Sequence, residues 1–155
     1  MNETTLIVPA DRPIILIERW FDAPVHLVWK ATTTPELVAR WYAPPFAEMV
    51  SCEIDLRVGG AWRIVLRARF GEAGFHGVYR EIVAPTRLVQ TSIFEPRPES
   101  TAIETASYVA DGARTKLVLE ITHPTFEARD GHVGSGMEAG MRAAHAQLDA
   151  LVRTL

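Results

Sequence analysis

The hydrophobic period changes near residue 123, and this change constrains the fold more than any other feature of the sequence. Between residues 46 and 122, short apolar runs alternate with turn residues, as in an antiparallel meander of about six strands. After residue 136, the apolar residues recur at spacings of four and three, which is one stripe of an amphipathic helix. A helix of roughly 20 residues is about 30 Å long and can cross such a sheet. The residues of this stripe are Met137, Met141, Ala144, Leu148 and Leu151.

The segment before the meander is predicted to contain one strand and two short helices. Residues 14–21 (IILIERWF) are rich in β-branched and aromatic residues, which favour a strand. Asp22 is expected to accept hydrogen bonds from the first turn of the next helix, and Pro24 suits that turn. A second short helix is expected to begin with Thr34 as its cap and Pro35 as its first residue.

The order of these elements predicts one α+β domain. The expected architecture is a helix-grip fold, in which a curved antiparallel β-sheet, with two short helices after its first strand, wraps around a long C-terminal helix. Residues 1–12 show no periodicity and are predicted to be a loose N-terminal lead-in to a single domain over residues 13–155. Residues 125–136 are interpreted as a polar stretch before the long helix.

Charge and composition argue against several classes of function. The net charge is −3 and the isoelectric point is about 5.9, whereas nucleic-acid-binding domains usually carry a basic surplus. The longest apolar run, residues 13–17, is far too short to span a membrane, and the N-terminus lacks the pattern of a secretory signal. The single cysteine, Cys52, cannot form an internal disulfide, which suits a reducing compartment. We therefore expect a cytoplasmic protein that binds neither nucleic acid nor membrane.

Motifs of known catalytic or metal sites are missing from the sequence. GxSxG, HExxH, CxxC and the P-loop do not occur, and the five histidines have no partner at a specific ligand spacing. We therefore expect no metal and no other cofactor. Cys52 is interpreted as a small buried hydrophobe rather than a nucleophile. Gly59-Gly60 is interpreted as a hairpin turn that requires positive φ, not as a phosphate-binding loop.

Short segments spread over nearly all of the chain after Pro13 carry a resemblance to a known family. The chain resembles the heat shock protein 90 ATPase activator-like branch of the START/SRPBCC superfamily, which also contains birch-allergen-like proteins and polyketide cyclases. Each segment is weak alone, and the resemblance rests on their number and order. They are Glu18-Arg19, Phe21 to Pro24, Val28-Trp29, Thr34 to Leu37 with Trp41, Asp55 to Arg57, Gly59-Gly60 with Trp62, Gly77 to Tyr79, Glu81-Ile82, Pro85 with Arg87-Leu88, Gly112 with Thr115 and Leu117, Glu127 to Asp130, and Gly136 to Glu138 with Gly140-Met141.

The resemblance implies a helix-grip fold with a central hydrophobic cavity, and no catalytic set is shared across the family. The function expected first is the binding of a small, largely apolar molecule between the sheet and the C-terminal helix. Two alternatives stay open: a polyketide cyclase- or hydrolase-like enzyme that uses the same cavity, and a domain that interacts with the chaperone heat shock protein 90. A homodimeric partner also stays open.

The side chains expected to line the cavity are aromatic and apolar residues of the meander and residues near the start of the long helix. Met137 and Met141 lie one turn apart, so both project from one helix face, with Trp62 and Tyr79 as the expected opposing walls. Methionine adapts to irregular gaps and lines permissive binding surfaces. The predicted lining residues are Trp41, Trp62, Ile64, Leu66, Tyr79, Phe94, Tyr108, Met137, Met141 and His145.

The enzyme alternative requires a general acid or base inside the cavity, with a pKa near the working pH. Strand alternation alone does not decide which polar side chains of the meander point inward. The residues of suitable type are His76, Tyr79, Glu81, Glu104 and His145.

Overall fold

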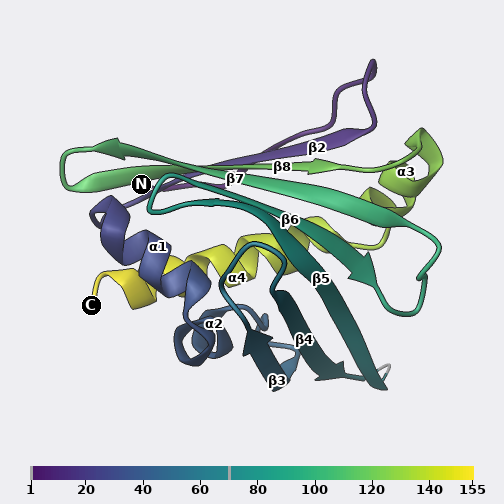
Figure 1. Ribbon diagram of the computed structural model, residues 1–155, viewed down its shortest axis with the longest axis horizontal. Coiled ribbons are helices and arrows are strands. Elements are labelled where there is room, and N and C mark those ends of the chain that lie inside the picture. Colours follow the sequence, from purple (N-terminus) through teal and green to yellow (C-terminus); the bar gives the residue numbers. More distant parts are fainter. Residues whose placement is uncertain (1, 70) are drawn as a thin grey trace.

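In the computed structural model, which describes residues 2–69 and 71–155, eight antiparallel strands form one curved sheet in the order β1-β2-β8-β7-β6-β5-β4-β3 (Figure 1). Strands β3 to β8 form the predicted meander, and β2 pairs with β8. The strands are β1 (Thr5–Ile7), β2 (Ile14–Phe21), β3 (Glu48–Ile54), β4 (Ala61–Ala68), β5 (Gly71–Val83), β6 (Arg87–Phe94), β7 (Thr101–Asp111) and β8 (Arg114–Thr122).

Four helices accompany the sheet in the described part of the chain. They are α1 (Val25–Thr33), α2 (Pro35–Trp41), α3 (Phe126–Gly134) and α4 (Met137–Val152). Figure 1 shows that α4 crosses one side of the sheet, and that α1 and α2 lie beside its C-terminal half. The stripe predicted from the sequence is the face of α4 that packs on the sheet, because Ala144, Leu148 and Leu151 are all buried there. The predicted α+β architecture is confirmed.

The N-terminal segment is not the loose lead-in that the sequence predicts, although Met1 itself lies outside the described residues. Thr5–Ile7 forms β1, which pairs with β2, and Thr4 is buried. A strand of this length is too short to show a hydrophobic period of its own. Its order comes from contacts with residues that are distant in sequence, which a local pattern cannot reveal.

One prediction about a helix start is wrong, and one helix was not predicted. Pro24 itself is the N-cap of α1, and Asp22 does not cap the helix. The Asp22 carboxylate instead accepts hydrogen bonds from Arg114, at 3.1 Å, and Arg153, at 2.8 Å. The helix that was not predicted is α3, which lies within the predicted polar stretch. Its N-cap is Thr125, whose side chain accepts a hydrogen bond from the backbone N–H of Ala128 at 3.0 Å.

The Gly59-Gly60 turn is present, but its two glycines are required for different reasons. Positive φ occurs at Gly59, where φ is 85°, and not at Gly60. A Cβ at Gly60 would lie only 2.1 Å from the carbonyl oxygen of Asp55. Both glycines also bond to the backbone of Tyr79, since the N–H of Gly59 donates to its carbonyl and the carbonyl of Gly60 accepts from its N–H. The turn therefore fixes the backbone at a residue of the predicted cavity.

Gly60→Val is expected to lower the free energy of unfolding by about 3 kcal/mol, the upper end of the range for overpacking, because backbone atoms surround the missing Cβ. Gly59→Ala is the matched control and should cost about 1–2 kcal/mol, since it adds only left-handed strain in open space. Urea denaturation of the two variants provides the comparison. An unchanged midpoint for Gly60→Val would contradict the close approach.

Candidate ligand cavity

A cavity of about 370 Å³ lies between the concave face of the sheet, α2 and the N-terminal half of α4. Nine of the ten predicted side chains line it. They come from α2, from strands β4, β5 and β7, and from α4. These nine are Trp41, Trp62, Ile64, Leu66, Tyr79, Tyr108, Met137, Met141 and His145.

Phe94 is the predicted residue that does not line the cavity. It is the last residue of β6, it is 40% exposed, and its ring packs against the ring of Phe75, with the two centroids 5.1 Å apart and the planes tilted by 36°. Phe75 lines the cavity instead. Phe94 therefore packs against a lining residue and does not line the cavity itself.

The two tryptophans present rings without a free polar group to the cavity. The indole N–H of Trp62 donates to the carbonyl oxygen of Thr91 at 3.1 Å, and that of Trp41 donates to the carbonyl oxygen of Ala31 at 2.9 Å. The Trp62 bond requires a glycine at position 77, because a Cβ there would lie 1.8 Å from the same Thr91 oxygen. Both rings are thereby held in fixed orientations and contribute apolar surface.

One strip of polar side chains crosses this apolar lining. Tyr79, Gln90 and Glu104 are direct cross-strand neighbours on β5, β6 and β7, and all three line the cavity. The side-chain amide of Gln90 donates to Oε1 of Glu104 at 2.8 Å. We call these three residues the polar strip. Burial raises the pKa of Glu104, because removal from water disfavours the charged carboxylate.

Three tyrosines add hydroxyl groups to the cavity lining. Burial raises the pKa of Tyr108 to about 12, and it also raises the pKa of Tyr42 and Tyr79. The Tyr108 hydroxyl lies 2.7 Å from Oγ1 of Thr32, which itself donates to the carbonyl oxygen of Val28 at 3.0 Å. The proton in the Tyr108–Thr32 bond therefore comes from Tyr108. The Tyr42 and Tyr79 hydroxyls have no hydrogen-bond partner among the described residues.

The predicted acid–base candidates divide between the cavity and the outer surface. Tyr79, Glu104 and His145 line the cavity. His76 does not, because its Nδ1 lies 2.8 Å from a carboxylate oxygen of Glu95, outside the cavity. Glu81 is also excluded from the lining, since it is exposed and accepts a hydrogen bond from Arg87 at 2.8 Å.

Two histidines line the cavity and are neutral at pH 7. Burial lowers the pKa of both His132 and His145 to about 4. Nδ1 of His132 lies 3.0 Å from Nε2 of His123, a pair that the sequence analysis missed because β8 and α3 bring the two residues together. The part of the chain that the structure describes has no group of three or more His, Cys, Asp or Glu residues that could hold a metal ion.

Acid is expected to destabilise the protein between about pH 6.5 and pH 4, because in this range these histidines are protonated in the unfolded state but not in the folded state. Their pKa is about 4 in the folded state and 6.5 without burial, so their contribution to stability is complete above about pH 6.5. It is lost as the pH falls toward 4, at up to about 1.4 kcal/mol per pH unit for each histidine. Urea melts across this range should show the decline, and His145→Gln should reduce its slope. A flat profile for the natural protein would contradict the buried neutral state.

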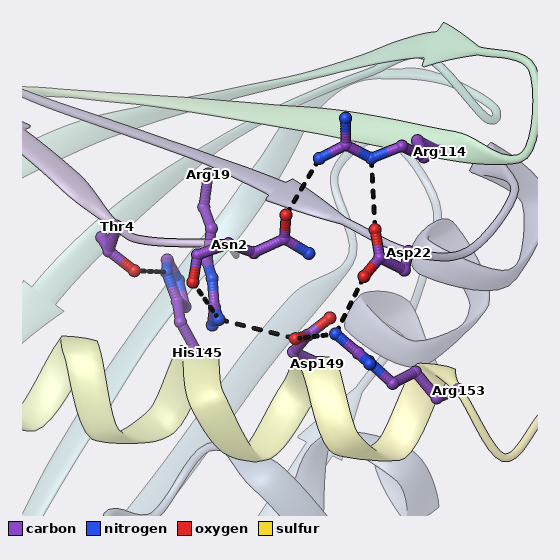
Figure 2. A network of polar contacts seen from close by, with 8 residues as sticks. All are labelled: Asn2, Thr4, Arg19, Asp22, Arg114, His145, Asp149 and Arg153. Carbon is purple, nitrogen blue, oxygen red and sulfur yellow. Dashed lines mark hydrogen bonds and ion pairs between the residues drawn. The ribbon is translucent and has the colours of Figure 1, made fainter.

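A chain of polar contacts fastens the N-terminal segment beside the cavity (Figure 2). Each residue in it bonds to the next, and the chain closes on itself. A branch connects the segment to the lining, since Oγ1 of Thr4 lies 3.5 Å from Nδ1 of His145. We call this set the N-terminal clamp. Its closed chain consists of Asn2, Arg19, Asp149, Arg153, Asp22 and Arg114.

Gln90 and Tyr42 line the cavity but were not predicted from the sequence, and Glu104 was predicted only as a residue suitable for acid–base chemistry, not as a lining residue. Gln90 lies two residues from Leu88 on β6, and Glu104 lies two residues from Ala106 on β7. The period of a strand therefore places both members of each pair on the same face of the sheet. That signal did not tell which face is concave. Tyr42 could not be found by period, because it follows the last residue of α2.

A curved antiparallel sheet that grips one long helix, with a cavity between them, defines a helix-grip protein. The model of the family described as "Activator of Hsp90 ATPase homolog 1-like protein" matches residues 22–153. The chain belongs to this family. A search of the curated proteins found no match.

Solved structures share the fold along nearly the whole chain. A protein from Rhodobacter sphaeroides is 24% identical, with a TM-score of 0.90, and the match covers 99% of this chain and 100% of that one. A protein from Nitrosomonas europaea is 27% identical, with a TM-score of 0.81, covering 95% and 97%. An AHSA1-like protein from Aeromonas hydrophila is 20% identical, with a TM-score of 0.70, covering 89% and 93%. No helix among the described residues has the length and apolar character needed to cross a membrane.

Proposed function

We propose that this protein binds a small, largely apolar molecule in the cavity between the sheet and α4. The observation that carries the proposal is the cavity itself, which holds about 370 Å³ and is lined mostly by aromatic and aliphatic side chains. Pockets for small molecules commonly have volumes of about 300–1,000 Å³ and a few polar groups in an apolar wall. The polar strip supplies such groups.

Close packing elsewhere in the domain supports this interpretation. Protein interiors are packed as densely as organic crystals, with few voids larger than a water molecule. Phe21, Val28 and Leu148 are fully buried beside the cavity, so the chain packs tightly where side chains fill the space. Met137 and Met141 stay only partly buried at the other end of the α4 stripe. The open volume is therefore local to the α4 start and the polar strip.

Met141→Trp is expected to leave the protein folded and to weaken ligand binding, because the indole ring would occupy the cavity. Ala139→Trp is a matched control, since Ala139 is exposed on the other side of α4. Thermal melting and titration with a neutral apolar dye should separate the two variants. If Met141 were close-packed core, the variant would instead lose about 1–3 kcal/mol of stability by overpacking.

The enzyme alternative is favoured by one observation, which is that Tyr79, Glu104 and His145 line the same cavity. A cyclase- or hydrolase-like reaction would use one of them as the general acid or base. No two of the three are hydrogen-bonded to each other among the described residues. Turnover of a polyketide-like substrate that Glu104→Gln abolishes would establish the enzyme, and binding without turnover would exclude it for that substrate.

A chaperone partner and a second copy of the chain stay predictions. The description of the matched family refers to an activator of Hsp90 ATPase, and this supports the chaperone as a proposed partner. Pull-down with the chaperone from the same organism tests it. Neither partner requires the cavity, so these experiments are independent of ligand binding.

A further inference from the structure

We infer that the ligand carries a compact organic cation, such as a protonated amine on an apolar body, which pairs with the carboxylate of Glu104 on the polar strip. This inference rests on the proposed function and names the class of ligand. Three observations carry it: the free hydrogen-bonding capacity of the strip, the charge of the cavity lining, and the aromatic rings around the strip.

The polar strip has unused hydrogen-bonding capacity that faces the cavity. Gln90 occupies Oε1 of Glu104, and Oε2 has no hydrogen-bond partner among the described residues. The Tyr42 and Tyr79 hydroxyls also have no partner there. None of these three oxygens belongs to the polar atoms that the protein encloses without a partner, so they remain accessible from the cavity. A ligand group with two or more N–H donors could satisfy them together.

Glu104 is the one cavity-lining side chain, among the described residues, that can carry a formal charge near neutral pH. The lining contains no lysine or arginine, and His132 and His145 are neutral because burial lowers the pKa of each to about 4. Burial of a carboxylate is unfavourable without a cation beside it. A ligand cation would supply that partner, whereas a ligand carboxylate would meet repulsion.

The surroundings of the carboxylate also suit a cation. Trp41, Trp62 and Tyr79 line the same cavity, and aromatic faces attract ammonium groups when water is excluded. Both indole N–H groups are already bonded to backbone carbonyls, so the rings offer no donor to an anionic ligand. The apolar remainder of the ligand would extend toward Met137 and Met141.

The test compares three probes with the same alkyl chain: octylamine, octanol and octanoate. Binding is followed by tryptophan fluorescence. Octylamine should bind about tenfold or more tightly than octanol, as expected for one charge-assisted hydrogen bond, and octanoate should bind most weakly. Glu104→Gln preserves the shape of the side chain and removes its charge. It should lower the affinity for octylamine by about tenfold or more and change the affinity for octanol by less than about threefold. Glu120→Gln on β8 is the control, because it removes the same charge outside the cavity lining.

A pH series on the natural protein adds a test that needs no variant. Burial raises the pKa of Glu104 by disfavouring the charged form, whereas a bound cation favours ionisation of the carboxyl group. Octylamine affinity should therefore rise as the pH is raised through the pKa of Glu104, with release of a proton, while octanol affinity stays constant. Calorimetry in buffers of different ionisation enthalpy measures the proton.

The outcomes distinguish the inference from the proposed function. If octanol binds as tightly as octylamine, or if octylamine binding survives Glu104→Gln, the inference of a cationic ligand is overturned and the proposed binding function stays in place. Octanoate that binds most tightly would overturn it as well. If none of the three probes binds and Met141→Trp changes no dye titration, both the function and the inference fail.

Discussion

Leu148→Ala is expected to lower the free energy of unfolding by about 2–5 kcal/mol, because it removes a fully buried side chain from the main core. Leu148 lies on the face of α4 that packs against the sheet, and Phe21, Val28 and Val152 belong to the same buried cluster. Those neighbours come from a strand and two helices. They have limited freedom to close the space that the side chain leaves.

Urea denaturation measures this loss, and Leu155→Ala is the matched control. Leu155 is 40% exposed at the end of the chain, so the same chemical change should alter stability by less than about 0.5 kcal/mol. The slope of the denaturation curve should stay unchanged if the variant loses only packing. A loss below about 1 kcal/mol for Leu148→Ala would show that the buried face of α4 is assigned wrongly.

The elements that the sequence predicts well are those whose order is encoded locally. The α4 stripe repeats with the helical period, so its buried face follows from spacing alone. The alternation of Trp62, Ile64 and Leu66 likewise predicts one face of β4, and all three line the cavity. In both cases the period is sustained over several residues, and the side chains face a single environment.

Helix α3 shows why other elements could not be predicted. Its buried residue is a charged one, Arg129, which is 5% exposed. The guanidinium donates to the backbone carbonyl oxygens of Pro9, Arg12 and Ile14, at 2.8, 2.9 and 3.2 Å. These partners lie more than a hundred residues earlier in the chain. Since α3 is docked by polar contacts across the fold, its sequence shows no apolar stripe.

The candidate site shows the same division. The alternation of residues along each strand predicts the aromatic lining of the cavity. The polar strip depends instead on the register between three strands. Gln90 meets both Tyr79 and Glu104 only because β5, β6 and β7 pair as they do. Turn lengths and a register shift after Tyr79 set that pairing. A single sequence carries no direct signal of such register.

The N-terminal clamp contains a buried ion pair that should be among the most sensitive positions in the chain. Arg19 is 7% exposed, and its Nη2 lies 3.6 Å from Oδ2 of Asp149 (Figure 2). Two of its nitrogens, Nε and Nη1, are buried without a partner. Burial lowers the pKa of Arg19, and the charge of Asp149 opposes this effect. Asp149 therefore offsets much of the cost of keeping the guanidinium charged inside the protein.

Asp149→Ala is expected to cost about 3–5 kcal/mol, because it leaves the buried guanidinium of Arg19 without its counter-charge. Arg153→Ala is the control, since it removes the other partner of Asp149. The Arg153 side chain is 53% exposed, so its loss should cost less than about 1 kcal/mol. Replacing both members of the buried pair, Arg19→Met with Asp149→Leu, should recover most of the loss, because no charge then remains buried. Urea melts at low and high salt give all three values, and the Asp149→Ala loss should change little with salt. Equal, small losses for Asp149→Ala and Arg153→Ala would show that Arg19 reaches water, which requires the N-terminal segment to leave α4.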